Sequence, residues 1–178
     1  MIGPTGIVLF VLLSGAAVAA SVHAWRAHET YGLIRFLGFE LLAALVGWNA
    51  ARWFRDPLAG RQLFSWVLLA ASLGLAVHGF HLLRSIGRAQ RRIMEATQVI
   101  VETGIYRFIR HPLYASLLLF VWGAFLKGLD VTSAALALPA TAAFALTARY
   151  EERFNLARFG SRYAAYMRRT KMFVPFIV

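Results

Sequence analysis

Two short segments of the sequence carry residue types that could bind a polar small molecule beside a membrane. The first contains Arg110, His111 and Pro112, and the second contains the adjacent carboxylates Glu151 and Glu152. Because proline suits the first turn of a helix, we expect Arg110 and His111 at a helix N-terminus, where free amide donors and basic side chains favour an anionic group. The alternative is that Arg110 reaches lipid phosphate and His111 only caps the helix.

The paired carboxylates follow a run of 18 residues, 131–148, that has no charged side chain. Adjacent residues on a helix face about 100° apart, so one carboxylate could face a site while the other pairs with Arg149 or Arg153. The alternative is an ordinary amphipathic helix held by charge pairs. Downstream, Phe159-Gly160 is typical of a helix end with a left-handed glycine cap, and Ser161 is expected to start a short helix that runs to Arg169.

The segment that precedes the first motif is predicted to be irregular. Residues 98–101 include β-branched side chains that favour extended backbone. Gly104 is expected at a turn, because glycine tolerates a positive φ angle.

Five apolar runs must position these segments. A membrane-spanning helix needs about 20 mostly apolar residues, and the runs cover residues 7–22, 36–51, 63–83, 113–126 and 131–148. The first run could be read as a signal peptide, but no lysine or arginine precedes it, so a retained helix is expected. Residues 127–130, Lys-Gly-Leu-Asp, predict a tight turn between the last two helices, and Pro139 predicts a kink in the fifth.

The composition agrees with a membrane protein. Of 178 residues, 60% are hydrophobic and 15% are charged, against roughly 25% charged in soluble domains. The apolar content excludes disorder, and the absence of cysteine excludes a disulfide scaffold. The net charge of +11 does not indicate a nucleic-acid binder, because the basic residues punctuate long apolar runs.

The basic residues also predict an orientation. Thirteen of the 19 lysines and arginines lie in residues 84–110 and 149–171, on either side of the predicted hairpin. The positive-inside rule places that face, and any active site on it, in the cytoplasm, with the N-terminus outside. One loop opposes this orientation, because residues 52–61 carry Arg52, Arg55 and Arg61 with only Asp56. We predict a transmembrane frame of three helices in 1–83 and a catalytic region in 84–178.

The motifs together resemble a known superfamily. Gly104-Ile105-Tyr106, Arg110-His111-Pro112-Leu113-Tyr114, Glu151-Glu152, and Phe159-Gly160 with Tyr163 and Tyr166 are similar to the isoprenylcysteine carboxyl methyltransferases and phospholipid methyltransferases. The resemblance covers residues 98–175, whereas the first 83 residues match only as apolar spans. It implies an all-α integral membrane enzyme with about five transmembrane helices that uses S-adenosylmethionine.

The resemblance also implies where the cofactor binds and what accepts the methyl group. The acceptor would be a small amphiphile that partitions into the membrane: a lipid amine, a thiol, or an isoprenoid-like hydroxyl or carboxyl. Arg110 and Glu152 are the candidates for shaping the reacting end. The residues implied to hold the cofactor are Arg91, Gln98, Val99, Ile100, Val101, Tyr106, His111, Pro112, Leu113, Tyr114 and Glu151.

The chemistry of the cofactor agrees with these residue types. Its carboxylate suits Arg110, His111 and a helix N-terminus, and Glu151 can accept hydrogen bonds from ribose hydroxyls or the amine. Methyl transfer needs mainly alignment and desolvation. A soluble methyltransferase is not indicated, because the chain has no glycine-rich loop of the dinucleotide-binding kind. We expect membrane lipids as partners, with no nucleic acid and no metal, and the oligomeric state stays open.

One departure bears on the acceptor. Prenylcysteine-type members carry an arginine four residues before the first glutamate, and this chain has Thr147 there. Carboxyl methylation of a prenylated cysteine is therefore disfavoured. Two other functions stay open: a non-enzymatic membrane module that retains the pocket, and an NADPH-dependent lipid reductase of related fold, which would need more helices than this length provides.

Three polar side chains inside the apolar frame need separate interpretations. Glu40 is costly in a membrane, and it could face a substrate route or pair with Arg35 or a histidine. His78 and His81 are spaced for one helix face, and packing is favoured over zinc because no further ligands lie close in the sequence.

Overall fold

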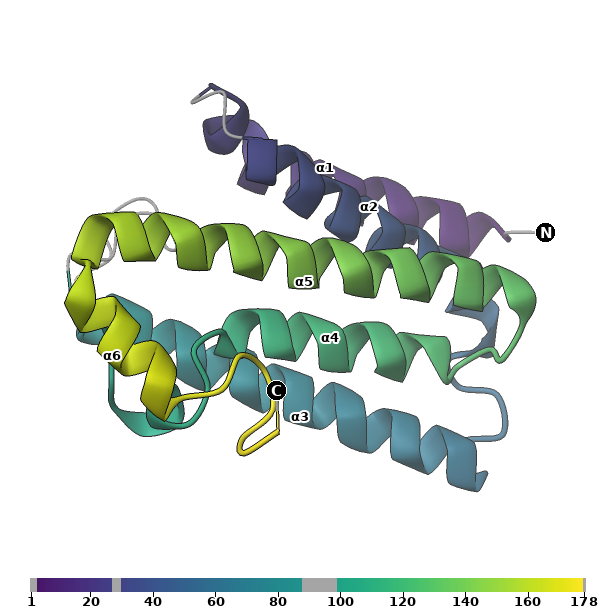
Figure 1. Cartoon of the computed structure of the whole chain (residues 1–178). Helices are drawn as coiled ribbons and strands as arrows, with labels where there is room; N and C mark the ends of the chain where they lie inside the picture. The colour runs from purple at the N-terminus through teal and green to yellow at the C-terminus, as the bar shows by residue number, and fades with distance from the viewer. Residues whose placement is uncertain (1–2, 27–29, 88–98, 178) are drawn as a thin grey trace. The chain divides into compact units, whose positions relative to one another are not determined.

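The computed structural model describes residues 3–26, 30–87 and 99–177, and within them the protein is all-α (Figure 1). No strand forms in these ranges, and the β pairing is an isolated bridge between Ile109 and Lys171. The helices are α1 (Pro4–Arg26), α2 (Thr30–Asn49), η1 (Ala50–Arg52), α3 (Gly60–Ser85), η2 (Gly104–Arg107), α4 (Pro112–Phe125), α5 (Val131–Phe159) and α6 (Ser161–Arg169).

Each of the five apolar runs is a helix, as the sequence predicts. Among the described residues, three segments are long and apolar enough to cross a membrane: Tyr31–Arg52, Gly60–Ser85 and Val131–Phe159. Two shorter apolar helices, Pro4–Ala19 and Pro112–Phe125, accompany them. Helices suit this composition because a lipid-exposed backbone must satisfy its hydrogen bonds within its own segment.

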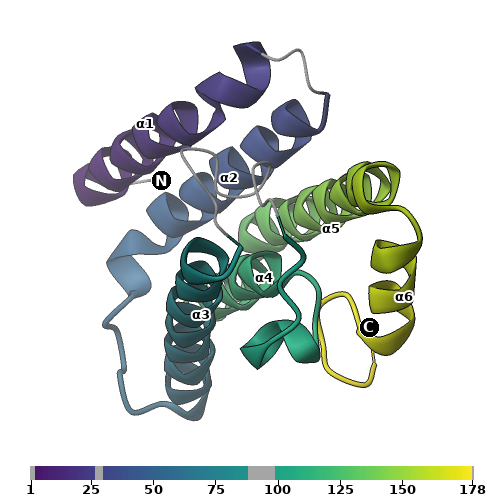
Figure 2. The ribbon, with the colours of Figure 1, turned by 90° about the vertical axis from the view of Figure 1, so that its left-hand side faces the viewer.

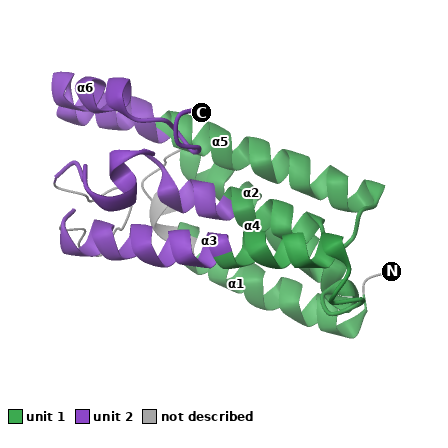
Figure 3. Ribbon diagram, turned by 90° about the horizontal axis from the view of Figure 1, so that it is seen from below, with its two compact units in different colours: residues 1–70, 118–150 green, residues 71–117, 151–178 purple. Residues whose placement is uncertain are grey.

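The described chain divides into two compact units (Figure 3). Unit 1 comprises residues 1–70 and 118–150, and unit 2 comprises residues 71–117 and 151–178. Helices α3, α4 and α5 each contribute to both units. The division by function at residue 84 stays a prediction, because compactness does not measure catalytic role.

In unit 1, α1 and α2 pack side by side along their lengths (Figures 1 and 2). The helices approach closely at Gly47, where an added Cβ would lie 2.7 Å from the carbonyl oxygen of Gly6. Elsewhere along the same two helices, Ser14 Oγ donates a hydrogen bond of 2.6 Å to Glu40 Oε2. The sequence suggests that Glu40 faces a substrate route or pairs with Arg35 or a histidine, and it does not indicate a serine hydroxyl on α1 as the partner.

The turn between α4 and α5 is held by polar side chains of unit 1. Asp130 caps the start of α5, because its Oδ1 accepts a bond of 2.7 Å from the Ser133 amide. The same carboxylate accepts bonds from Trp48 Nε1 and from Arg52. Asn49 donates to Ser133 Oγ at 3.1 Å and is fully buried. The predicted tight turn is confirmed, and buried polar contacts fix it to the end of α2.

In unit 2, glycine permits two close approaches that shape the region before α4. A Cβ at Gly79 on α3 would lie 3.3 Å from Leu113 and 3.4 Å from Pro112. Gly104 has φ +58°, and a Cβ there would lie 2.6 Å from Leu82 and 3.0 Å from His78 Nε2. His78 therefore packs against the η2 turn, in agreement with the packing role expected of it.

Candidate active site

Local sequence rules place the first motif. Gly104 adopts the predicted positive φ and begins η2, and Pro112 occupies the first position of α4. Arg110 and His111 immediately precede that helix. Gly160 has φ +57° and separates α5 from α6, as the sequence predicts.

The C-terminal segment pairs with this motif through the backbone. The amide of Arg110 donates to the Lys171 carbonyl at 2.8 Å, and the amide of His111 donates to the Met172 carbonyl at 3.1 Å. The Lys171 amide returns a bond of 3.0 Å to the Phe108 carbonyl. Three main-chain bonds thus fix the backbone immediately before α4, which limits how far Arg110 and His111 can move.

Arg110 and Glu152 form a buried ion pair. Arg110 Nε donates to Glu152 Oε1 at 2.6 Å, and each side chain is 9% exposed. A second guanidinium nitrogen of Arg110 donates to the carbonyl oxygens of Met167, at 3.3 Å, and Thr170. The guanidinium is therefore held by one carboxylate and two carbonyls of unit 2, and the charge of Glu152 is balanced within the protein.

Tyr114, His111 and Glu151 form a second polar group. Tyr114 Oη donates to Glu151 Oε1 at 2.5 Å, and His111 Nδ1 lies 3.9 Å from Glu151 Oε2. His111 Nε2 lies 3.4 Å from Glu152 Oε1, but among the described residues it makes no hydrogen bond of good geometry. Buried polar atoms normally have partners, so Nε2 is a candidate to bond a ligand.

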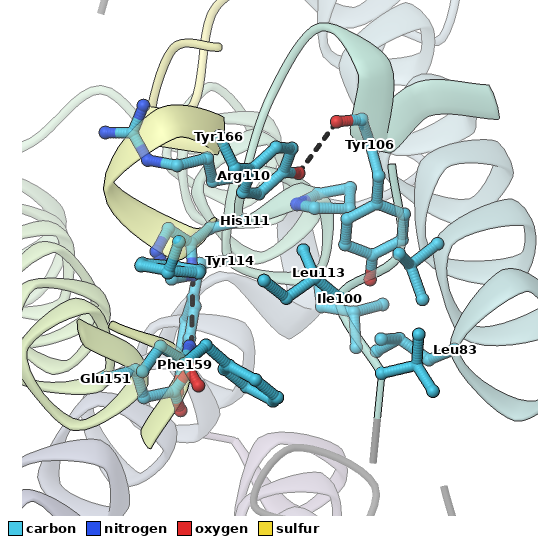
Figure 4. Close-up of a pocket in the computed structure, with 15 residues that line it drawn as sticks. Leu83, Ile100, Tyr106, Arg110, His111, Leu113, Tyr114, Glu151, Phe159 and Tyr166 are labelled. Atoms are coloured by element: carbon cyan, nitrogen blue, oxygen red, sulfur yellow. Dashed lines mark hydrogen bonds and ion pairs between the residues drawn. The ribbon is translucent and has the colours of Figure 1, made fainter. Parts of the chain in front are cut away.

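Three buried tyrosines complete the site. Tyr166 Oη donates to the Tyr106 carbonyl at 2.7 Å (Figure 4). Tyr106 Oη donates to the Gly79 carbonyl at 3.4 Å. Burial raises the pKa of Tyr163 to about 12, and a bond with Asn155 only partly opposes the shift. Burial also raises the pKa of Tyr106 and of Tyr166, with a further contribution from their tyrosine neighbours. All three phenols are therefore neutral at physiological pH.

These groups surround one cavity of unit 2, with about 600 Å³ of empty space including its open mouth (Figure 4). The structure brings ten predicted residues into its wall: Val99, Ile100, Val101, Tyr106, Arg110, His111, Pro112, Leu113, Tyr114 and Glu151. Glu152 contacts Arg110 but is not part of the wall. Arg91 and Gln98 lie outside the described residues.

The cavity wall also includes residues that the sequence reasoning did not assign to the site. They are Leu83, Asn155, Phe159, Tyr163 and Tyr166. Asn155 and Phe159 follow Glu151 at intervals of four, and such residues share one helix face. The spacing could have identified Asn155 and Phe159 as wall residues. If Glu151 lines a cavity, residues on the same face of α5 are expected to line that cavity too. In the described ranges no cluster of three or more metal-binding side chains occurs.

The fold and the site together define a class: a membrane protein, all-helical in its described residues, whose polar cavity is lined by a histidine-proline helix start and by a glutamate on a later helix. The sequence profile of the phospholipid methyltransferase family matches residues 61–162. The chain therefore belongs to the phospholipid methyltransferase family, which confirms the superfamily indicated by the motifs.

A curated relative gives a second comparison. Methanethiol S-methyltransferase 2 of Bradyrhizobium diazoefficiens is 32% identical over 120 residues, which cover 66% of this chain. The match covers 45% of that relative, so the chain spans about half of its length. Both matches are to proteins described as methyltransferases.

Proposed function

We propose that this protein transfers a methyl group from S-adenosylmethionine to an amphiphilic acceptor that partitions into the membrane. The observation that carries the proposal is the hydrogen bond between Tyr114 and Glu151, which joins two motifs 37 residues apart at the wall of one cavity. Neutral tyrosines, a histidine and a carboxylate lie together in this wall. Neither the motif that contains Tyr114 nor the one that contains Glu151 would form such a site alone.

The residues of the cavity fit the cofactor's chemistry. Its carboxylate would meet His111 Nε2, which is buried without a hydrogen bond of good geometry among the described residues, and the amides that begin α4. Its amine or ribose would meet Glu151. The adenine would pack on the apolar and aromatic wall around Ile100 and Phe159.

The bound cofactor would supply an electrophilic methyl group on a positively charged sulfur. The protein's own contribution is to align the acceptor, exclude water and take up the proton that the acceptor loses. Glu151 and His111 line the cavity and can accept a proton there. The ion pair holds Arg110 and Glu152 in one geometry, so both act by positioning the backbone and side chains before α4.

The charges in the cavity wall also disfavour a methyl acceptor that carries a carboxylate. Arg110 is the one arginine or lysine in the described wall, and a carboxylate and two carbonyls already hold it. Thr147 is fully buried and donates to the Ala143 carbonyl at 2.8 Å. An acceptor carboxylate would thus lack an uncommitted cation in this wall. A neutral thiol is the first acceptor to test, because the relative is named for S-methylation, and a lipid amine is the second.

Calorimetry in detergent tests the cofactor site. S-adenosylhomocysteine should bind the wild-type chain, and Glu151→Ala or His111→Ala should weaken binding at least tenfold, because each removes a hydrogen bond at a charged group. Arg168→Gln is a matched control, since Arg168 is exposed and outside the cavity wall. Unchanged affinity in both alanine variants would place the cofactor elsewhere, and binding of NADPH instead would favour the reductase alternative.

A further inference from the structure

A second cavity, in unit 1, has no role in the proposed methyl transfer. It lies where the loop between η1 and α3 meets the turn between α4 and α5, and it holds about 790 Å³ of empty space including its open side. Four basic and two acidic side chains line it. The wall consists of Arg52, Arg55, Asp56, Arg61, Lys127, Gly128, Leu129 and Asp130.

One acid of this wall is already committed. Asp130 forms an ion pair with Arg52 and also accepts bonds from Trp48 and from the Ser133 amide. Burial alone would raise the pKa of Asp130, but these hydrogen bonds outweigh it and hold the pKa well below its usual range. Asp130 thus stays ionised, and its negative charge balances that of Arg52. It does not balance the charges of the other basic side chains.

In the described wall, Asp56 is then the one acidic side chain left to balance the charges of the other three basic side chains. Arg55 is exposed, and its side chain makes no ion pair or hydrogen bond with a described residue. Arg61 donates to the carbonyl of Leu126, which is uncharged. Lys127 is the third, and the cavity therefore keeps an excess positive charge that no described side chain balances.

The groups in direct contact with the Lys127 ammonium are uncharged. Its ammonium is fully buried, donates to Gln62 Oε1 at 2.9 Å, and lies 3.5 Å from the centre of the Trp66 ring and 5.5 Å from that of Trp53. Two aromatic faces and an amide orient the charge, but they do not neutralise it. An anion bound in the cavity would supply the missing charge.

Apolar side chains around the cavity indicate where that anion comes from. Phe54, Leu58, Leu129 and Val131 are between 58% and 86% exposed, although all four are large apolar residues. Exposed apolar groups beside basic side chains and tryptophans are typical of the boundary between lipid tails and headgroups. The positive-inside rule also leaves the arginines of this loop unexplained, which a bound ligand would resolve.

We propose that this cavity binds the phosphate group of an anionic phospholipid, at a site separate from the methyl-acceptor site. Arginine is suited to phosphate because its planar fork donates two parallel hydrogen bonds. Arg55 and Arg61 bind the phosphate, Lys127 adds a fixed charge behind them, and the exposed apolar side chains contact the acyl chains. The site does not rest on the methyl-transfer proposal.

Native mass spectrometry of the full chain in detergent tests this site. Phosphatidylglycerol, phosphatidylcholine and inorganic phosphate are added in separate arms. Wild-type protein should retain one phosphatidylglycerol in preference to phosphatidylcholine. Since a basic side chain near an anionic surface contributes about fivefold in affinity, Arg55→Gln should bind phosphatidylglycerol about fivefold more weakly, and Arg55→Gln with Arg61→Gln about 25-fold.

The control variant is Arg168→Gln, which removes the same charge from an exposed position outside the cavity. It should retain phosphatidylglycerol as the wild type does. Equal loss in Arg168→Gln, or no loss in the double variant, would overturn the site, because net charge or detergent competition would then explain retention. Displacement of the lipid by inorganic phosphate at equal concentration would overturn the assignment to a lipid.

Discussion

The buried ion pair between Arg110 and Glu152 gives the strongest test of how the site is held. Glu152→Gln keeps the size of the side chain and one acceptor oxygen but removes the charge that faces Arg110 Nε at 2.6 Å. Breaking a buried pair by removing one partner costs about 3 to 5 kcal/mol, because the other charge stays buried. We expect a loss of about 3 kcal/mol, at the lower end of this range. The glutamine oxygen and the two carbonyls that accept bonds from the Arg110 guanidinium still stabilise its charge.

At roughly 2 to 4 °C per kcal/mol for a chain of this size, the midpoint of thermal unfolding should fall by about 6 to 12 °C. Far-ultraviolet circular dichroism during heating measures it, because it reports the helices of both units. In the double variant Arg110→Gln with Glu152→Gln, the loss in the free energy of unfolding should be smaller than the sum of the two single losses. The difference, which is the coupling energy, should be about 2 kcal/mol. A shift under 2 °C in Glu152→Gln, or additive losses, would refute the view that this pair holds the site.

An exposed ion pair of the same unit is the matched control. Arg169 contacts Glu102 at 2.8 Å, with side chains 64% and 30% exposed. Surface pairs contribute about 0 to 1 kcal/mol, so Glu102→Gln should move the midpoint by no more than about 4 °C. A similar loss in both glutamate variants would attribute the effect to overall charge rather than to burial.

Three further predictions concern single residues. Tyr114→Phe removes the bond of 2.5 Å to Glu151 and should weaken S-adenosylhomocysteine binding by about 1 to 2 kcal/mol in calorimetry; unchanged affinity would contradict it. Burial lowers the pKa of Lys127 from 10.5 to about 8, so the unfolded chain binds more protons between these pH values. Wild-type stability should therefore rise relative to Lys127→Met across that window, by at most about 3 kcal/mol, and a flat difference would count against it. Gly104→Ala should lower the melting temperature, because Gly104 has positive φ and an added Cβ would lie 2.6 Å from Leu82; an unchanged melting temperature would disprove the close packing.

The helices and their ends were predictable because their causes are local. Apolar runs of membrane length, Pro112 at the start of α4, and Gly104 and Gly160 at positive φ act within a few residues of the chain. The family was predictable because its motifs are specific when they occur together. These features needed no knowledge of which helices pack against one another.

The contacts between distant segments were not predictable. The sequence gives Arg110 and Glu152 as neighbours of a site, but it does not show that they neutralise each other at 2.6 Å. It likewise gives no sign that Lys171 and Met172 bond the backbone at Arg110 and His111. Such pairings depend on tertiary packing, which a single sequence does not encode in any local pattern.

Transfer of a radiolabelled methyl group from S-adenosylmethionine by the purified chain in lipid vesicles tests the central claim most directly. Long-chain thiol, lipid amine and long-chain alcohol are offered in separate arms. We predict that the label enters the thiol or the amine, and that Glu151→Ala abolishes the transfer while Arg168→Gln does not. Binding of the cofactor without transfer to any of the three acceptors would contradict an enzyme and favour a non-enzymatic membrane module.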